Sequence, residues 1–353
     1  MRADQALERC RYAGAAPVTL EQYERVLGNT DTARWRPTIP IIREAFKELV
    51  LDESTIDFLE RSLHSGRTLM LYGPSGNGKT HVLTEFIRHL DGEVLIPTSL
   101  YAYGQIIRIF DPMVHERVDV EPKSDNGNGH HGDEAWDRRW IRIRRPGLIV
   151  GGEFTEESLE LGYDPVTRFY QAPKHLKAQG GVLVVDDFGR QKVAPADMLN
   201  RWIMALERGR DNLLLRTGES IEVPFHITIL FSTNLNPSDL ADSAYLRRVP
   251  YKSYMPPAGP ERFADILRVV VEKQEMQVPA ADILAVAKFL DAATGHDLSG
   301  SLARDLVTIV FDNAEHEGRE VTFDVPSFEL AYRQFTGIPD GEPLAPLSQA
   351  TAR

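Results

Sequence analysis

The sequence predicts an α/β fold: a doubly wound parallel sheet that carries an inserted β-hairpin and is followed by a small helical lid domain. Three observations lead to this prediction. Short apolar runs alternate with helical patterns from about residue 41, as in parallel sheets that are covered by helices. A glycine-rich loop separates the apolar run at 69–72 from the helical pattern at 81–90. After residue 259 only helical patterns follow.

The chain accordingly divides into four predicted parts, one of which has a long insert. They are an N-terminal helical appendage (1–40), an α/β domain (41–255) with an insert (101–178) that contains a disordered loop (121–137), a helical lid domain (256–336) and a flexible tail (337–353). In the appendage, helical patterns at 4–12 and 20–27 are separated by a segment with Gly14 and Pro17.

The α/β domain begins with a regular alternation that the insert then breaks. The expected order is a helix, the strand at 69–72, the helix at 81–90 and a core strand that starts at 94–97. In the insert, residues 105–110 and 139–144 have strand composition, and the second stretch alternates apolar and basic residues. A polar, glycine-rich segment between them is typical of a mobile loop. We therefore interpret the insert as a β-hairpin or small sheet.

The parallel sheet is expected to resume after the insert. An apolar run at 182–185 ends in two acids, and a helical pattern at 194–207 separates it from a second buried run at 227–234. The lid is predicted from the helical patterns at 260–273, 279–290, 299–313 and 325–335.

The glycine-rich loop at 73–80 is a complete phosphate-binding P-loop. Its residues are Gly73, Pro74, Ser75, Gly76, Asn77, Gly78, Lys79 and Thr80. The glycines let consecutive N–H groups face a phosphate, and the N-terminus of the following helix adds partial positive charge. Lys79 is expected to reach the β- and γ-phosphates, and the Thr80 hydroxyl to bind Mg²⁺. The loop therefore predicts a site for ATP with Mg²⁺.

Polar residues at the ends of two later strands are candidates for the chemistry of this site. Asp186 follows an apolar strand, where its carboxylate could hold Mg²⁺ together with Thr80, and Asp187 could polarise the attacking water. Asn234 ends the next buried strand, where its amide could hold that water. Acids after a strand can also cap a helix, and Asn234 can open a turn, but behind a P-loop we favour the catalytic interpretation.

Three arginines are further candidates. Adjacent arginines such as Arg247 and Arg248 usually form surface ion pairs, but in an oligomeric ATPase one of them could reach the γ-phosphate of a neighbour. Arg304 opens the third lid helix. A cation early in a helix opposes the helix dipole, and a buried anion partner would explain its place there. An ion pair with Asp305 is the alternative.

Composition limits the partners. The 353 residues carry a net charge of −12 with a sequence pI near 5.4, which leaves nucleic acid open as a partner but disfavours it. The cationic run at 138–145 could contact nucleic acid, although pairing with the abundant acids is the favoured interpretation. A single cysteine, Cys10, a charged N-terminus and no apolar run near the about 20 residues of a membrane span indicate a cytoplasmic protein with no membrane partner.

The order of these motifs resembles the AAA+ ATPase superfamily over roughly residues 41–336. The resemblance implies that residues 73–80 are Walker A, Asp186 and Asp187 are Walker B, and Asn234 is sensor 1. It also implies an arginine finger at Arg247 or Arg248 and sensor 2 at Arg304. Members of the family commonly hydrolyse ATP as rings, usually hexamers, and act on a macromolecular partner.

Two features refine the resemblance. The approach to Walker B is similar to that of members with an insert before this motif, and three short phrases, at 12–17, 105–112 and 186–191, resemble an uncharacterised bacterial AAA+ group. Most members have glutamate where this chain has Asp187, whereas helicase loaders, replication initiators and some transposon subunits also have two aspartates.

The sequence thus favours a ring-forming, Mg²⁺-dependent ATPase that remodels a protein client, with the insert as the candidate effector element. A DNA-linked ATPase of the loader or transposition type is the first alternative. A slowly hydrolysing assembly switch is the second, and Asp187 is the residue that would allow it.

Overall fold

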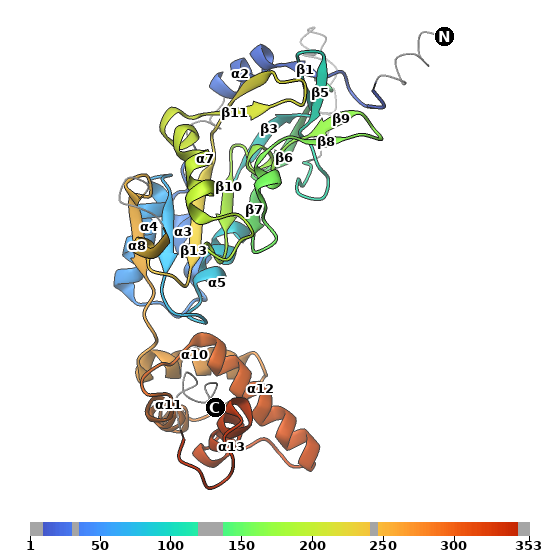
Figure 1. The fold of residues 1–353 in the computed structure, drawn as a ribbon. Coiled ribbons are helices and arrows are strands. Elements are labelled where there is room, and N and C mark those ends of the chain that lie inside the picture. The colour runs from blue at the N-terminus through green and yellow to red at the C-terminus, as the bar shows by residue number, and fades with distance from the viewer. Residues whose placement is uncertain (1–9, 30–34, 119–136, 241–245, 345–353) are drawn as a thin grey trace, which may run out of the picture. The chain divides into compact units, whose positions relative to one another are not determined.

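The computed structural model describes residues 10–29, 35–118, 137–240 and 246–344 (Figure 1). The chain forms two compact units. The first comprises Met1–Lys47, Asp57–Met70 and Leu83–Lys252, and the second comprises Glu48–Ile56, Leu71–Val82 and Ser253–Arg353. The P-loop therefore belongs to the same unit as the C-terminal helices. Among the described residues, no helix is long and apolar enough to cross a membrane.

The main sheet has the strand order β14-β2-β13-β10-β7. Its strands are β14 (Tyr251–Tyr254), β2 (Leu69–Tyr72), β13 (Thr228–Thr233), β10 (Val182–Val185) and β7 (Gly147–Val150). The central strand β10 pairs in parallel with both β13 and β7. Every residue of β10 is buried, which requires helices on both faces of the sheet. The predicted doubly wound α/β fold is confirmed.

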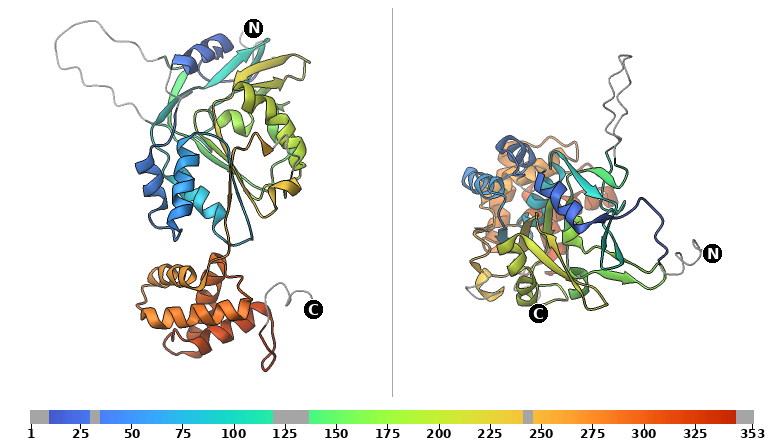
Figure 2. Two further views of the ribbon diagram at one scale, coloured as in Figure 1. Left: turned by 90° about the vertical axis from the view of Figure 1, so that its left-hand side faces the viewer. Right: turned by 90° about the horizontal axis from the view of Figure 1, so that it is seen from above.

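Helices cover this sheet on its two sides. Residues of α7 (Pro195–Arg208) share a buried cluster with those of β10 and β13, including Trp202, Leu183 and Phe231. The other early helices are α3 (Ile39–Phe46), α4 (Glu53–His64) and α5 (Lys79–Arg88). Figure 2 shows α3 and α4, in blue, on the side of the sheet opposite α7.

One predicted core strand was wrong. Residues 94–97 were expected to join the parallel sheet, but β3 (Glu93–Pro97) pairs antiparallel with β6 (Trp140–Arg144) in a separate two-stranded sheet. The place beside β10 belongs to β7 instead. A Cβ on Gly147, the first residue of β7, would lie 2.5 Å from Cγ2 of Ile87 on α5, so glycine permits the close approach of helix and strand.

The insert does contain a β-hairpin, but not the expected pair of strands. β4 (Ser99–Ala102) pairs antiparallel with β5 (Gln105–Arg108) through a two-residue turn, in which Tyr103 and Gly104 have φ of 48° and 77°. In the hairpin interpretation the stretches 105–110 and 139–144 would pair with each other, but 139–144 pairs with β3 instead. Most of the predicted disordered loop at 121–137 lies outside the described residues.

A second sheet joins the N-terminal segment to the insert. Its order is β1-β4-β5-β9-β8, with β1 (Val18–Thr19), β9 (Phe169–Gln171) and β8 (Gly162–Asp164). The predicted helix at 20–27 is confirmed as α2 (Leu20–Asn29). The predicted helix at 4–12 lies mostly outside the described residues, and residues 10–12 form no helix. Val18, Tyr23 and Leu27 are buried with residues of β4 and β5, so this segment completes the core of the insert.

Further short elements connect these sheets. They are 3-10 helix η2 (Glu156–Leu159), α6 (Lys174–Lys177), the antiparallel strands β11 (Arg210–Leu214) and β12 (Ser220–Pro224), and α8 (Pro237–Leu240).

The C-terminal part of the second unit is helical, as predicted. Its helices are α10 (Pro260–Glu272), α11 (Ala280–Thr294), α12 (Gly300–Glu317) and α13 (Val325–Thr336). Phe263, Leu290, Leu306 and Tyr332 are fully buried in their common core. Ser299 caps α12 by accepting a hydrogen bond from the N–H of Leu302, which fixes where this helix begins.

A buried ionic network holds three elements of the first unit together. Asp211 of β11 accepts a hydrogen bond from His175 of α6 at 2.8 Å and forms an ion pair with Arg201 of α7. Arg201 also forms an ion pair with Glu160 at 2.8 Å. Burial alone would raise the pKa of Asp211, but the hydrogen bonds from His175 and Arg201 outweigh it, and the pKa is lowered.

We expect Asp211→Ala to lower the free energy of unfolding by about 1–3 kcal/mol, because it leaves the buried His175 without the acceptor of its hydrogen bond, while Arg201 keeps its ion pair with Glu160. Since the pKa of Asp211 is lowered in the folded state, its contribution is complete above the unfolded value of about 3.9 and is lost as the pH falls through the folded value. Urea titrations of both proteins at pH 7 and at acid pH measure this. A difference that stays the same down to the lowest pH would contradict the assignment.

Candidate functional site

The P-loop has the backbone that anion binding requires. Gly73, Gly76 and Gly78 have φ of 136°, 80° and 79°, a region that side chains strongly disfavour. Lys79, the first residue of α5, is only 5% exposed and donates hydrogen bonds from Nζ to the carbonyls of Gly73 at 2.8 Å and Pro74 at 2.7 Å. The loop thus curls around its own lysine at the N-terminus of a helix, which is a favourable place for phosphate.

Residues of the helical part contact this loop within the second unit. The Asn77 amide donates to the carbonyl of Met255 at 3.2 Å, and the N–H of Met255 donates to the carbonyl of Tyr72 at 2.8 Å. The N–H of Ser301, in the first turn of α12, donates to the carbonyl of Gly76 at 3.2 Å. These contacts to Met255 and Ser301 were not predicted, because no local pattern in the sequence indicates them.

The acid pair lies at the carboxyl end of β10 in the first unit. The N–H of Asp186 donates to the carbonyl of Val150 at 2.8 Å, so Asp186 continues the pairing of β10 with β7. Its carbonyl accepts from the Gln191 amide at 2.7 Å. Asp187 has a left-handed backbone, with φ of 49°, and is exposed. Aspartate tolerates this conformation better than most residues.

Asn234 lies next to this turn. It follows the last residue of β13, and its Nδ2 donates to Oδ1 of Asp187 at 3.3 Å. Behind it, the Thr233 hydroxyl donates to the carbonyl of Phe188 at 2.6 Å, and the N–H of Phe188 donates to the carbonyl of Ser232 at 2.7 Å. The first unit therefore brings together the two residues that the sequence proposed for handling the attacking water.

The two adjacent arginines differ in their surroundings. Arg248 forms an ion pair with Glu207 of α7, with Nε 2.8 Å from Oε1. Arg247 is exposed, and within the described parts of the chain its side chain has no hydrogen bond or ion pair. Arg304 lies one turn into α12 with its side chain 71% exposed, and its Nε is 3.8 Å from Oδ1 of Asp305.

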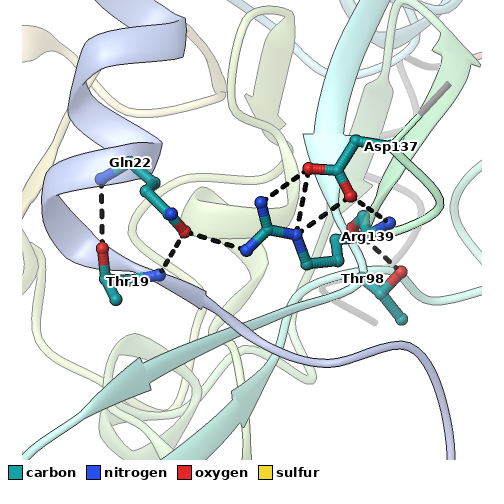
Figure 3. A network of polar contacts seen from close by, with 5 residues as sticks. All are labelled: Thr19, Gln22, Thr98, Asp137 and Arg139. Carbon is teal, nitrogen blue, oxygen red and sulfur yellow. Dashed lines mark hydrogen bonds and ion pairs between the residues drawn. The ribbon is translucent and has the colours of Figure 1, made fainter. Parts of the chain in front are cut away.

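The basic run of the insert is largely neutralised. Arg139 is held by Asp137 and Gln22, and Figure 3 shows its guanidinium between these two side chains. Arg142 pairs with Glu93 at 3.4 Å and Arg144 pairs with Glu116 at 2.7 Å. The pairing that the sequence analysis favoured is therefore found, and these arginines do not form an unopposed cationic surface.

The residues present fit ATP and magnesium by their chemistry. The P-loop offers backbone N–H groups, a helix N-terminus and a buried ammonium, which suit a triphosphate. Thr80, in the first turn of α5, supplies a hydroxyl oxygen, and Asp186 supplies a carboxylate. Oxygen atoms of these two kinds are the ligands that Mg²⁺ prefers.

Comparison of the sequence with known proteins finds no matching family model and no matching curated protein. Comparison of the fold finds similar solved structures. Domain III of the replication initiation protein DnaA of Thermotoga maritima is 14% identical with a TM-score of 0.45, and the match covers 82% of this chain and 95% of that one. NtrX of Brucella abortus is 14% identical with a TM-score of 0.48, and the match covers 80% of this chain and 55% of NtrX. The RuvB Holliday junction branch migration motor of Thermotoga maritima is 12% identical with a TM-score of 0.48, and the match covers 85% of this chain and 74% of RuvB.

The strand order and the motifs of this chain indicate its fold class. The strand that leads into the P-loop is next to β13 in the sheet, and β13 is next to β10, so the strands with the three motifs are neighbours. Ligands of open α/β sheets bind at the carboxyl ends of such strands. This sheet, its P-loop and the helical part that follows give the chain the α/β P-loop NTPase fold that the sequence motifs predict.

Proposed function

We propose that this protein is a Mg²⁺-dependent ATPase of the cytoplasm that assembles as a ring and remodels a protein partner. The observation that carries the proposal is the P-loop with buried Lys79 inside it and helix α5 directly after it. Gly73, Gly76 and Gly78 supply the backbone conformation, and residues 73–80 bind the phosphates. Thr80 and Asp186 hold Mg²⁺, which neutralises charge on the phosphates.

In this proposal, hydrolysis depends on Asp187 and Asn234. Their side chains are hydrogen-bonded to each other, so Asn234 can hold the Asp187 carboxylate and the attacking water in one place. The carboxylate accepts a proton from that water as it attacks the γ-phosphate. Aspartate is shorter than glutamate, so slow turnover, with ATP binding acting as an assembly switch, remains the alternative.

We assign the role of the trans-acting finger to Arg247. Its side chain is exposed, whereas Arg248 is held by Glu207 of its own chain. Arg304 is proposed to contact the nucleotide as sensor 2, since its side chain is exposed and its ion pair with Asp305 is long, at 3.8 Å. A ring, which we expect to be a hexamer, would bring Arg247 to the phosphate of a neighbouring subunit.

Arg247→Ala is expected to lower turnover about 1,000-fold, while Arg248→Ala changes it little, because exposed ion pairs contribute at most about 1 kcal/mol. Mixing Arg247→Ala subunits with Asp187→Asn subunits should restore part of the activity, since some sites then combine an intact finger with an intact acid. Phosphate release by the separate and mixed proteins measures this. No recovery on mixing, with both variants assembled, would contradict action in trans.

The partner is proposed to be a protein. The tip of the β4–β5 hairpin exposes Tyr101 and Tyr103, with 48% and 63% of each residue accessible, which suits contact with a polypeptide. Arg142 and Arg144, which could have favoured DNA, are paired with acids. Light scattering without nucleotide and with a poorly hydrolysed ATP analogue tests assembly. A ring-sized species supports the proposal, and a monomer under both conditions contradicts it.

A further inference from the structure

The tip of the P-loop is covered by the first turn of α12. The N–H of Ser301 donates to the carbonyl of Gly76 at 3.2 Å. Groups in the first turn of a helix have no partner within the helix, so this carbonyl satisfies a donor that would otherwise need water. Ser299, the capping residue of the same helix, lies beside it, with its Oγ 3.1 Å from Oγ of Ser301.

The two serine hydroxyls occupy the space beside Gly76. A Cβ at this position would lie 2.3 Å from Oγ of Ser301 and 2.9 Å from Oγ of Ser299, both closer than real Cβ contacts. Gly78 offers a comparison within the same loop. Its φ of 79° is nearly that of Gly76, at 80°, but a Cβ there meets no atom within 4 Å. Backbone conformation requires glycine at both positions, and crowding by α12 adds a second requirement at position 76 alone.

We propose that Ser301 is a positioning residue for phosphate binding. By holding the Gly76 carbonyl toward α12 and filling the space beside Gly76 with its hydroxyl, it fixes the conformation of the loop that is to bind the phosphates. A second contact within the same unit is the hydrogen bond that the Asn77 amide donates to the carbonyl of Met255. This inference rests on the proposed function, because it assumes that the loop binds ATP.

A double-mutant cycle between positions 76 and 301 tests the proposal. Affinity for a fluorescent ATP analogue with Mg²⁺ and the Tm without nucleotide are measured for the unaltered chain, Gly76→Ala, Ser301→Ala and the double variant. We expect Gly76→Ala to weaken binding at least tenfold. Ser301→Ala keeps the N–H and removes the hydroxyl, so its affinity reports the contribution of the hydroxyl alone. The double variant should bind at least threefold more tightly than Gly76→Ala, because the closest overlap, 2.3 Å from Oγ of Ser301, is gone while Oγ of Ser299 at 2.9 Å remains.

Gly78→Ala provides the matched control, since it introduces the same backbone strain without a clash. Its effect should simply add to that of Ser301→Ala. In a chain that binds ATP, additive effects of Gly76→Ala and Ser301→Ala on affinity would overturn the role of Ser301. Coupling in Tm without coupling in affinity would also overturn it, because the contact would then be structural only. A complete lack of ATP binding by the unaltered chain would refute the proposed function itself, and the role of Ser301 with it.

Discussion

Lys79→Ala is expected to weaken ATP binding at least 100-fold, or about 2.7 kcal/mol. The buried ammonium of Lys79 is held by the carbonyls of Gly73 and Pro74, so it is already in the loop that would surround the phosphates. Its removal takes away the positive charge on which binding of a triphosphate most depends. Titration of the purified protein with a fluorescent ATP analogue and Mg²⁺ measures the change.

Lys288→Ala is a suitable control, because it removes the same charge from an exposed position on α11. It should leave affinity within twofold of the unaltered chain. Equal affinities for Lys79→Ala and the unaltered chain would refute the P-loop assignment. The far-ultraviolet circular dichroism of each variant shows whether the fold is retained.

Asp187→Asn is expected to spare ATP binding and to reduce turnover at least 100-fold. Asparagine tolerates the left-handed backbone at this position as well as aspartate does, so the turn should keep its shape. The amide cannot accept a proton from the attacking water, and general-base catalysis typically contributes about 100- to 10,000-fold. Steady-state phosphate release at saturating ATP gives the rate, and the nucleotide titration gives the affinity.

The control for this variant is Asp197→Asn, which makes the same change at an exposed position in the first turn of α7. It should leave both turnover and affinity unchanged within twofold. If turnover survives in Asp187→Asn, the activation of water must be assigned to another residue. If the unaltered chain binds ATP but releases phosphate no faster than Asp187→Asn, the assembly switch becomes the better interpretation.

Local patterns were sufficient for the elements whose stability is largely local. The helices of the C-terminal part and α5 follow from amphipathic spacing and from capping residues within one or two turns. The P-loop follows from its residues alone, because its conformation depends on glycines at fixed positions. Asp186 and Asn234 could be placed at strand ends because β10 is an unbroken apolar run and β13 has the apolar centre Ile229–Phe231.

Strand pairing could not be decided in the same way. The run at 94–97 and the run in β7 are both short and apolar, and nothing near either one shows which will lie beside β10. That choice depends on contacts between residues far apart in the sequence, such as Gly147 with Ile87 of α5. The surroundings of the two arginines differ for the same reason, since Arg248, unlike Arg247, forms an ion pair with Glu207, 41 positions away.

The sequence by itself therefore determined the fold class, the phosphate-binding loop and the residues that are candidates for the chemistry. These depend on residue type and short spacing, which a single chain displays directly. The tertiary structure decided which strand completes the sheet, which arginines are neutralised, and that the first turn of α12 holds the carbonyl of Gly76. Each of these is a contact between distant segments, and only the folded chain brings such segments within hydrogen-bonding distance.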